Sequence, residues 1–203
     1  MKINNKNLIL ISGARSSLGL EVKKQIEKLS VKYLVINTNS ISLKKITNQT
    51  KLIKKKIIHF EKITFLNISS RIQPIDLIGE QKNHEIYENI MVNIFVPVII
   101  INYLLSTSKK IYIINITSGA AKSMNNKLSL YSLSKKYIEF FLKFLSKENK
   151  KNFIFFKNFD PKIMKSYTHS LLLKKKIFRN SKNLKYTSAN HNAKKLIKII
   201  KKI

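Results

Sequence analysis

The sequence predicts an α/β fold in which helices cover both faces of a doubly wound parallel sheet. Short apolar runs typical of buried strands alternate along the chain with longer amphipathic segments typical of helices. A chain of 203 residues with 44% hydrophobic content is long enough to bury a substantial core. No internal repeat or linker divides it, so we expect one domain over residues 1–203, with its ligand at the carboxyl ends of the strands.

The expected elements follow one another in a regular order. Strands are predicted at residues 8–12, 33–38, 63–67, 76–78, 110–116 and 153–156. Helices are predicted at residues 18–29, 84–106, 128–147 and 189–202, with a short helix at 42–47.

The first strand leads into a turn that contains two glycines, Gly13 and Gly19. A strand, a glycine turn and a helix together present backbone N–H groups and a positive helix end to a phosphate. Gly13 would permit the tight turn, and Gly19 would permit close packing of the helix. Ordinary strand–helix connections also use glycine and serine, so this segment alone favours neither interpretation.

A second pattern indicates proton-transfer chemistry. Tyr131 and Lys135 are four residues apart on a predicted helix and therefore share one face. A nearby cation lowers a tyrosine pKa, and such a tyrosine can exchange a proton with a carbonyl or alcohol oxygen. Ser118 follows the apolar run at 111–116 and could reach the same oxygen. On spacing alone a chance pairing is the better explanation, because the chain has 37 lysines.

Composition limits the other functional classes. The chain has no cysteine and its four histidines lack ligand spacing, so we expect no metal site. The polar N-terminus is unlike a signal peptide, and the longest apolar stretch, 94–105, is too short to span a bilayer; we expect a cytoplasmic protein without a membrane segment.

The net charge of +30 comes almost entirely from lysine, because only three arginines are present. Nucleic-acid binders favour arginine for bidentate contacts, so we expect solvated lysine faces and no nucleic-acid partner. The abundance of lysine (37), isoleucine (33) and asparagine (21) indicates an A+T-rich genome.

Taken in order, these motifs resemble the classical type of the short-chain dehydrogenase/reductase family. The family's turn, Thr-Gly-x-x-x-Gly-x-Gly, corresponds to residues 12–19, with Ser17 in place of the middle glycine. The family's catalytic Ser, Tyr and Lys correspond to Ser118, Tyr131 and Lys135, and its helix asparagine to Asn93. The Pro-Gly-x-x-x-Thr segment corresponds to residues 161–166, with Lys162 in place of glycine. The resemblance covers about residues 7–200.

The resemblance implies a Rossmann-like sheet of order 3-2-1-4-5-6, without the family's seventh strand. It also implies the catalytic set Asn93, Ser118, Tyr131 and Lys135, in which Lys135 lowers the pKa of Tyr131 and Asn93 fixes Lys135 through a water. The residues implied in cofactor binding are Gly13, Arg15, Ser17, Leu18, Gly19, Asn39, Asn67, Ile68, Tyr131, Lys135, Pro161, Ile163 and Ser166.

The expected cofactor is NADP in preference to NAD. The end of the second strand, Asn37-Thr38-Asn39, offers no carboxylate to repel a 2′-phosphate, and Arg15 lies in the turn. Asn67 follows the third strand, where the family often has an aspartate that contacts adenine. The family's Asn-Asn-Ala-Gly after the fourth strand is expected near residues 76–81 and is absent there.

The leading hypothesis is therefore an NADP-dependent oxidoreductase that interconverts a carbonyl and an alcohol. Its substrate could be a small molecule or an acyl group on a carrier protein, and the long helices 84–106 and 128–147 are available for a homodimer. A catalytically decayed dinucleotide-binding or regulatory protein is the alternative, which Ser17 and Lys162 favour.

Overall fold

The structure is a computed structural model that describes residues 6–38, 42–148, 154–177 and 184–203. Its centre is one parallel sheet with the strand order β2-β1-β3-β4-β5. The strands are β1 (Asn7–Ser12), β2 (Lys32–Ile36), β3 (Lys62–Asn67), β4 (Lys110–Ile116) and β5 (Ile154–Phe159).

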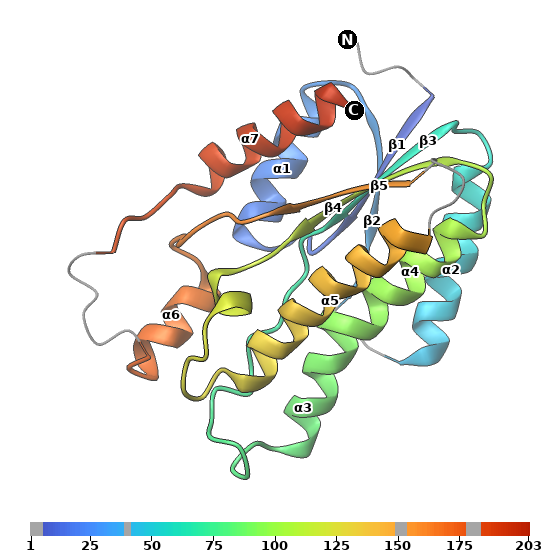
Figure 1. Cartoon of the computed structure of the whole chain (residues 1–203). Coiled ribbons are helices and arrows are strands. Elements are labelled where there is room, and N and C mark those ends of the chain that lie inside the picture. The colour runs from blue at the N-terminus through green and yellow to red at the C-terminus, as the bar shows by residue number, and fades with distance from the viewer. Residues whose placement is uncertain (1–5, 39–41, 149–153, 178–183) are drawn as a thin grey trace.

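Helices cover both faces of this sheet, as Figure 1 shows. One face carries α1 (Ser17–Glu27) and α7 (Ala189–Lys202), and the other carries α2 (Leu43–Ile57), α4 (Val96–Leu105) and α5 (Ser129–Glu148). The shorter elements are α3 (Asn83–Ile90), the π-helical η1 (Met91–Phe95), the 3-10 helix η2 (Gly119–Lys122) and α6 (Tyr167–Lys174).

The two cores explain why the central strands are apolar without alternation. In β1, Ile9 and Ile11 pack toward α1 and α7, whereas Leu8 and Leu10 pack toward α2, α4 and α5. Successive side chains of a strand point to opposite faces, so a strand covered on both faces must be apolar at every position. All six residues of β1 are buried accordingly.

The chain reverses its direction of travel across the sheet at β1. It passes from β1 outward to β2 and then returns to the other side of β1 to form β3, β4 and β5. A crevice forms at the carboxyl ends of the strands where such a reversal occurs, and it is the usual ligand position in open α/β sheets. The doubly wound, Rossmann-like class expected from the sequence is confirmed.

The structure corrects the place of one strand. Residues 76–78, expected as the strand beside β1, form no strand; β3 takes that place and pairs with both β1 and β4. The segment that follows the strand beside β1 is therefore Asn67-Ile68-Ser69-Ser70, and not residues 76–81. The three-residue run at 76–78 is too short to compete with β3, which is buried at five of its six positions.

Three other expectations need adjustment. The helix α2 is longer than the predicted 42–47, because Ile46, Ile53 and Ile57 extend one buried face through its lysines. The predicted helix 84–106 is interrupted by η1. The helix α6 was not predicted.

The α3–η1–α4 rod is the one helix in the described ranges that is long and apolar enough to cross a membrane by length and composition. It covers Asn83–Leu105, and half of its most apolar window is buried inside the fold. Core packing of residues such as Ile100, Ile101 and Leu104 against the sheet accounts for this apolar character.

Candidate active site

Polar side chains form a ladder along the carboxyl ends of the strands. Ser12, Asn67 and Asn115 occupy matching positions on β1, β3 and β4, and Asn158 continues the row on β5. The Ser12 hydroxyl donates to the Asn67 amide oxygen (3.1 Å), and Asn67 and Asn115 each donate to the next asparagine (2.9 Å). The sheet thus satisfies its buried amides internally just below the crevice.

The turn between β1 and α1 depends on both of its glycines. Gly13 has φ +72°, and a Cβ there would lie 2.5 Å from the backbone nitrogen of Ser69. A Cβ on Gly19 would lie 2.1 Å from the carbonyl oxygen of Gly13. The Ser16 hydroxyl caps α1 by accepting from the Gly19 N–H (3.0 Å). Because neither glycine has a side chain, the turn can pass directly over the segment that follows β3.

Two cavities lie over this edge of the sheet. The first, of about 740 Å³, is lined by Ser118, Tyr131 and Lys135 and is named here the serine–tyrosine cavity. The second, of about 850 Å³, is lined by Arg15 and Arg71 and is named the arginine cavity. The lining residues that both cavities share are Ser16, Ser70, Ile72 and Thr168. The two cavities therefore meet beside the glycine turn and form one elongated cleft.

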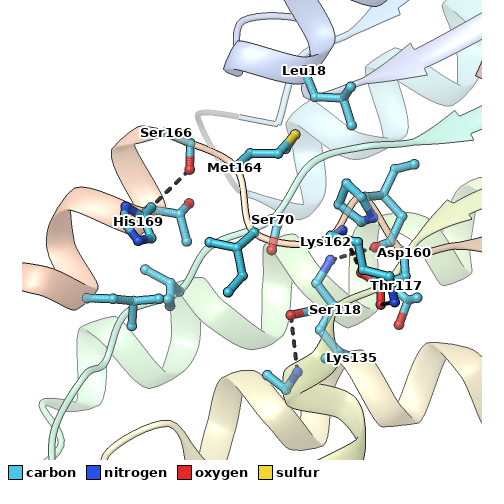
Figure 2. Close-up of a pocket in the computed structure, with 18 of the residues that line it drawn as sticks. Leu18, Ser70, Thr117, Ser118, Lys135, Asp160, Lys162, Met164, Ser166 and His169 are labelled. Carbon is cyan, nitrogen blue, oxygen red and sulfur yellow. Dashed lines mark hydrogen bonds and ion pairs between the residues drawn. The ribbon is translucent and has the colours of Figure 1, made fainter. Parts of the chain in front are cut away.

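Tyr131 and Lys135 are both buried on α5, at the floor of the serine–tyrosine cavity. The Lys135 Nζ lies 5.9 Å from the centre of the Tyr131 ring and donates to the carbonyl oxygen of Ile116 at 2.9 Å. Ser118 lies two residues beyond that carbonyl, at the start of η2. Figure 2 shows Ser70, Ser118 and Lys135 around this cavity, with Asp160 and Lys162 beside them.

Burial controls the protonation of both α5 groups. It raises the pKa of Tyr131 above its ordinary value of 10.0; the hydroxyls of Ser118 and Ser70 oppose this rise, and Asp160 adds to it. The groups that oppose the rise are these two hydroxyls, and Lys135, from which the lowering was expected, is not among them. Burial also lowers the pKa of Lys135 to about 8, against an opposing effect of Glu139.

Glu139 connects α5 to the end of β4. It stands one helical turn after Lys135, and its carboxylate accepts a hydrogen bond from the Thr117 hydroxyl. Thr117 lies between Ile116, whose carbonyl accepts from Lys135, and Ser118. Glu139 therefore connects the residue that follows β4 to the helix that carries Lys135.

The Asp160-Pro161-Lys162 segment forms the opposite wall of the cavity. Lys162 has φ +61°, the left-handed conformation that favours the glycine expected here. Its Nζ lies 3.1 Å from Asp160, and its own N–H donates to the same carboxylate. The Lys162 side chain is 71% exposed, so it is held at the rim of the cavity and does not fill it.

Asn93 lies in a network of direct hydrogen bonds to backbone and side-chain groups. Its amide nitrogen donates to the Arg71 carbonyl (2.7 Å) and its amide oxygen accepts from the Arg71 N–H (2.8 Å). The same nitrogen lies 3.0 Å from the Ser134 hydroxyl, next to Lys135 on α5. Asn93 thus ties η1 to the segment after β3 and to α5, and its predicted role toward Lys135 stays a prediction.

The structure brings most of the predicted site residues together. The serine–tyrosine cavity is lined by the predicted residues Ser17, Leu18, Ile68, Ser118, Tyr131, Lys135, Pro161, Ile163 and Ser166. Gly13 and Arg15 line the arginine cavity. Gly19 supports the turn, whereas Asn67 and Asn93 are buried in side-chain networks outside both linings. Asn39 lies outside the described residues.

Sequence reasoning missed Ser70, Arg71, Asp160 and His169, all of which line the cleft. Asp160 directly precedes Pro161. Because the chain has only ten acidic residues, an acidic residue at this position was a signal that the sequence offered. Ser70 and Arg71 become visible only once β3 is placed beside β1.

These features define a class: a doubly wound α/β protein whose glycine turn and buried Ser–Tyr–Lys group share one cleft. The model of the short chain dehydrogenase family matches residues 6–176. The chain belongs to this family of NAD(P)-dependent oxidoreductases. No curated protein matches it in sequence.

Solved structures share the fold at low sequence identity. A 4-hydroxyisoleucine dehydrogenase complexed with NADH has a TM-score of 0.77 and 18% identity, over 96% of this chain and 90% of that chain. ElxO with NADP bound has a TM-score of 0.77 and 17% identity, over 94% and 90%. A short-chain dehydrogenase from Streptomyces avermitilis has a TM-score of 0.75 and 13% identity, over 97% and 84%.

Proposed function

We propose that this protein interconverts a carbonyl compound and an alcohol, with Tyr131 as the proton donor and acceptor and NADP as the preferred cofactor. The observation that carries the proposal is the meeting of Ser118, Tyr131 and Lys135 in a cavity that continues into the glycine turn. None of the three is adjacent in sequence to that turn, so only the fold brings them together.

The residues of the cleft fit a dinucleotide. Gly13 leaves no room for a side chain, and the first turn of α1 offers the N–H groups of Ser17 and Leu18 to a pyrophosphate. Ile68, Pro161, Ile163 and Ser166 would flank the nicotinamide half, and Lys135 would reach its ribose. Asn67, which is engaged in the buried ladder, is not included.

The preference for NADP rests on Arg15. Its guanidinium donates to the Asn37 side chain at 3.2 Å, which holds the positive charge near the end of β2. Asn37 and Thr38, which also line the arginine cavity, are uncharged. A 2′-phosphate would meet a cation there and no carboxylate from these two residues.

In the direction of reduction, the bound cofactor supplies a hydride to the carbonyl carbon. Tyr131 donates its proton to the carbonyl oxygen, and the Ser118 hydroxyl orients that oxygen by a hydrogen bond. Because the pKa of Tyr131 is raised, the phenol carries its proton at neutral pH, as a donor must. The Lys135 ammonium, charged below about pH 8, stabilises the phenolate that remains.

The lining of the serine–tyrosine cavity favours a substrate with an apolar group beside its carbonyl. Ile72, Leu128 and Leu172 pack around Tyr131 in one apolar cluster. An acyl chain satisfies this requirement, and a basic protein would attract an acidic carrier protein. We propose a small carbonyl compound or a carrier-bound acyl group as the substrate, in a cytoplasmic homodimer.

The test is turnover of NADPH with a panel of ketones that includes acetoacetyl thioesters, both free and carrier-bound. Tyr131→Phe should abolish turnover and leave NADPH affinity nearly unchanged. Tyr137→Phe is the matched control, because Tyr137 is on the same helix but 48% exposed. The alternative, a decayed dinucleotide-binding protein, requires NADPH binding without turnover on any substrate, and that result would overturn the catalytic proposal.

A further inference from the structure

Arginine is rare in this chain, and its placement is informative. Only three of the forty basic residues are arginines. Two of them, Arg15 and Arg71, line the arginine cavity, and the third, Arg179, lies outside the described residues. Arginine differs from lysine in its planar set of donors, which match two oxygens of a phosphate at once. Two arginines in one cavity therefore indicate a phosphate ligand more strongly than lysines would.

The backbone of Arg71 is fixed from both sides. Its N–H and carbonyl bond to the Asn93 side chain, and the carbonyl also accepts from Asn89 at 3.0 Å. Both asparagines lie in the α3–η1 rod. The backbone of Arg71 is thus held rigidly a few residues after β3, and the residue needs little further ordering to bind a ligand.

The guanidinium of Arg71 is only partly satisfied. One terminal nitrogen forms an ion pair with Glu88, whereas the Nε–H is buried and has no hydrogen-bond partner among the described residues. A buried donor without an acceptor is unfavourable, and such groups are rare unless a ligand or water completes them. Around this guanidinium the cavity carries the charges of Arg15, Lys23 and Glu88, which leaves a net positive lining.

We propose that Arg71 is a second phosphate-binding residue, which acts with Arg15 on the cofactor. This inference rests on the proposed function, because the ligand is the same dinucleotide. Arg71 binds either the adenosine 2′-phosphate or the pyrophosphate, and Glu88 is the partner of the guanidinium when no phosphate is bound.

The experiment measures the affinity of the full chain for NADPH and for NADH by calorimetry. Arg71→Gln should weaken NADPH binding about tenfold or more. If the 2′-phosphate is the ligand group, NADH binding stays unchanged; if the pyrophosphate is, both affinities fall equally. Either pattern supports the proposal. Lys143→Gln controls for the loss of one positive charge, because Lys143 lines neither cavity.

Glu88→Gln separates phosphate binding from a structural ion pair. Removal of the competing carboxylate should leave NADPH affinity unchanged or increase it, opposite to the effect of Arg71→Gln. If both substitutions weaken binding equally, or if Arg71→Gln binds NADPH like the wild type, the inference is wrong and the proposed function stands. If the wild type binds neither dinucleotide, both fail. Should Arg71→Gln not fold, Arg71→Lys keeps the charge without the planar donors and should still weaken binding.

Discussion

The positive charge of Lys135 is unfavourable in the folded state, because the side chain that carries it is buried. Its side chain is almost completely buried, and burial lowers its pKa from 10.5 to about 8. The protein therefore places an ammonium group where the proposed mechanism uses it beside Tyr131, although its burial there is unfavourable for the folded state.

Lys135→Met should stabilise the protein at neutral pH. A fall of the pKa from 10.5 to about 8 corresponds to a loss of about 3 kcal/mol of unfolding free energy below pH 8. Methionine removes that loss but leaves the Ile116 carbonyl without its donor, so a net gain of about 1–2 kcal/mol is expected. The gain should shrink as the pH rises from 8 toward 10.5, because the wild-type lysine becomes neutral in the folded state first. Urea unfolding across this pH range measures it.

Lys136→Met is the control for this prediction, since Lys136 is exposed on the same helix. It should change the unfolding free energy little and without a pH trend. A Lys135→Met protein that is less stable than the wild type at pH 7 would contradict the argument.

Lys162 gives a second prediction at the scale of one residue. At φ +61° a side chain is strained by about 1 kcal/mol relative to glycine. Lys162→Gly should therefore be more stable than Lys162→Ala by about 1 kcal/mol, since both lose the Asp160 ion pair and only alanine keeps the strain. Urea unfolding of the two variants provides the comparison, and equal stabilities would show that the turn relaxes.

Between elements, the Thr117–Glu139 hydrogen bond joins the end of β4 to α5. Glutamine at position 139 could still accept from Thr117 but would carry no charge. Glu139→Gln should therefore move the pKa of Lys135 further below 8, because the carboxylate raises it. Thr117→Val removes the hydrogen bond, keeps the carboxylate and should leave that pKa nearly in place. The lysine ε-carbon resonance that titrates near pH 8, assigned by its loss in Lys135→Met, reports the change; equal shifts in both variants would contradict it.

Elements with a strong local pattern could be predicted from the sequence, and those decided by long-range packing could not. The apolar runs of β1 and β4 and the four-residue spacing on α5 specify their own structure, so Tyr131 and Lys135 face one cavity as expected. The choice of β3 as the neighbour of β1 depends on contacts between residues far apart in the sequence. The Ser12 hydroxyl donates to the carbonyl of Leu66, 54 residues later, and Ser12 pairs in register with Asn67. Because that pairing was misassigned, Ser70 and Arg71 were missed. The π-turn at η1 has no sequence signal that we can identify.

At the scale of the whole molecule, charge and apolar surface act in opposite directions. The net charge of +30 makes any self-association electrostatically unfavourable at low salt. Yet α5 exposes an apolar stripe at helical spacing, which consists of Leu133, Tyr137, Phe140 and Phe144. These side chains are 48–66% exposed. Because they lie along one stripe, they differ from the scattered single apolar residues that are normal on a protein surface. The stripe is the surface on which we expect the proposed homodimer to form.

The dimer should therefore depend on salt. As added salt screens the repulsion between two chains of charge +30, the fraction of dimer should rise, and light scattering coupled to size-exclusion chromatography measures it. Phe140→Glu places a carboxylate in the middle of the stripe and should give a monomer at every salt concentration, because burial of the charge is unfavourable. Ile58→Glu is the control, since Ile58 is 63% exposed and directly follows α2, a different helix. A wild-type protein that is monomeric at high salt, or a Phe140→Glu protein that stays dimeric, would show that the α5 stripe has another role.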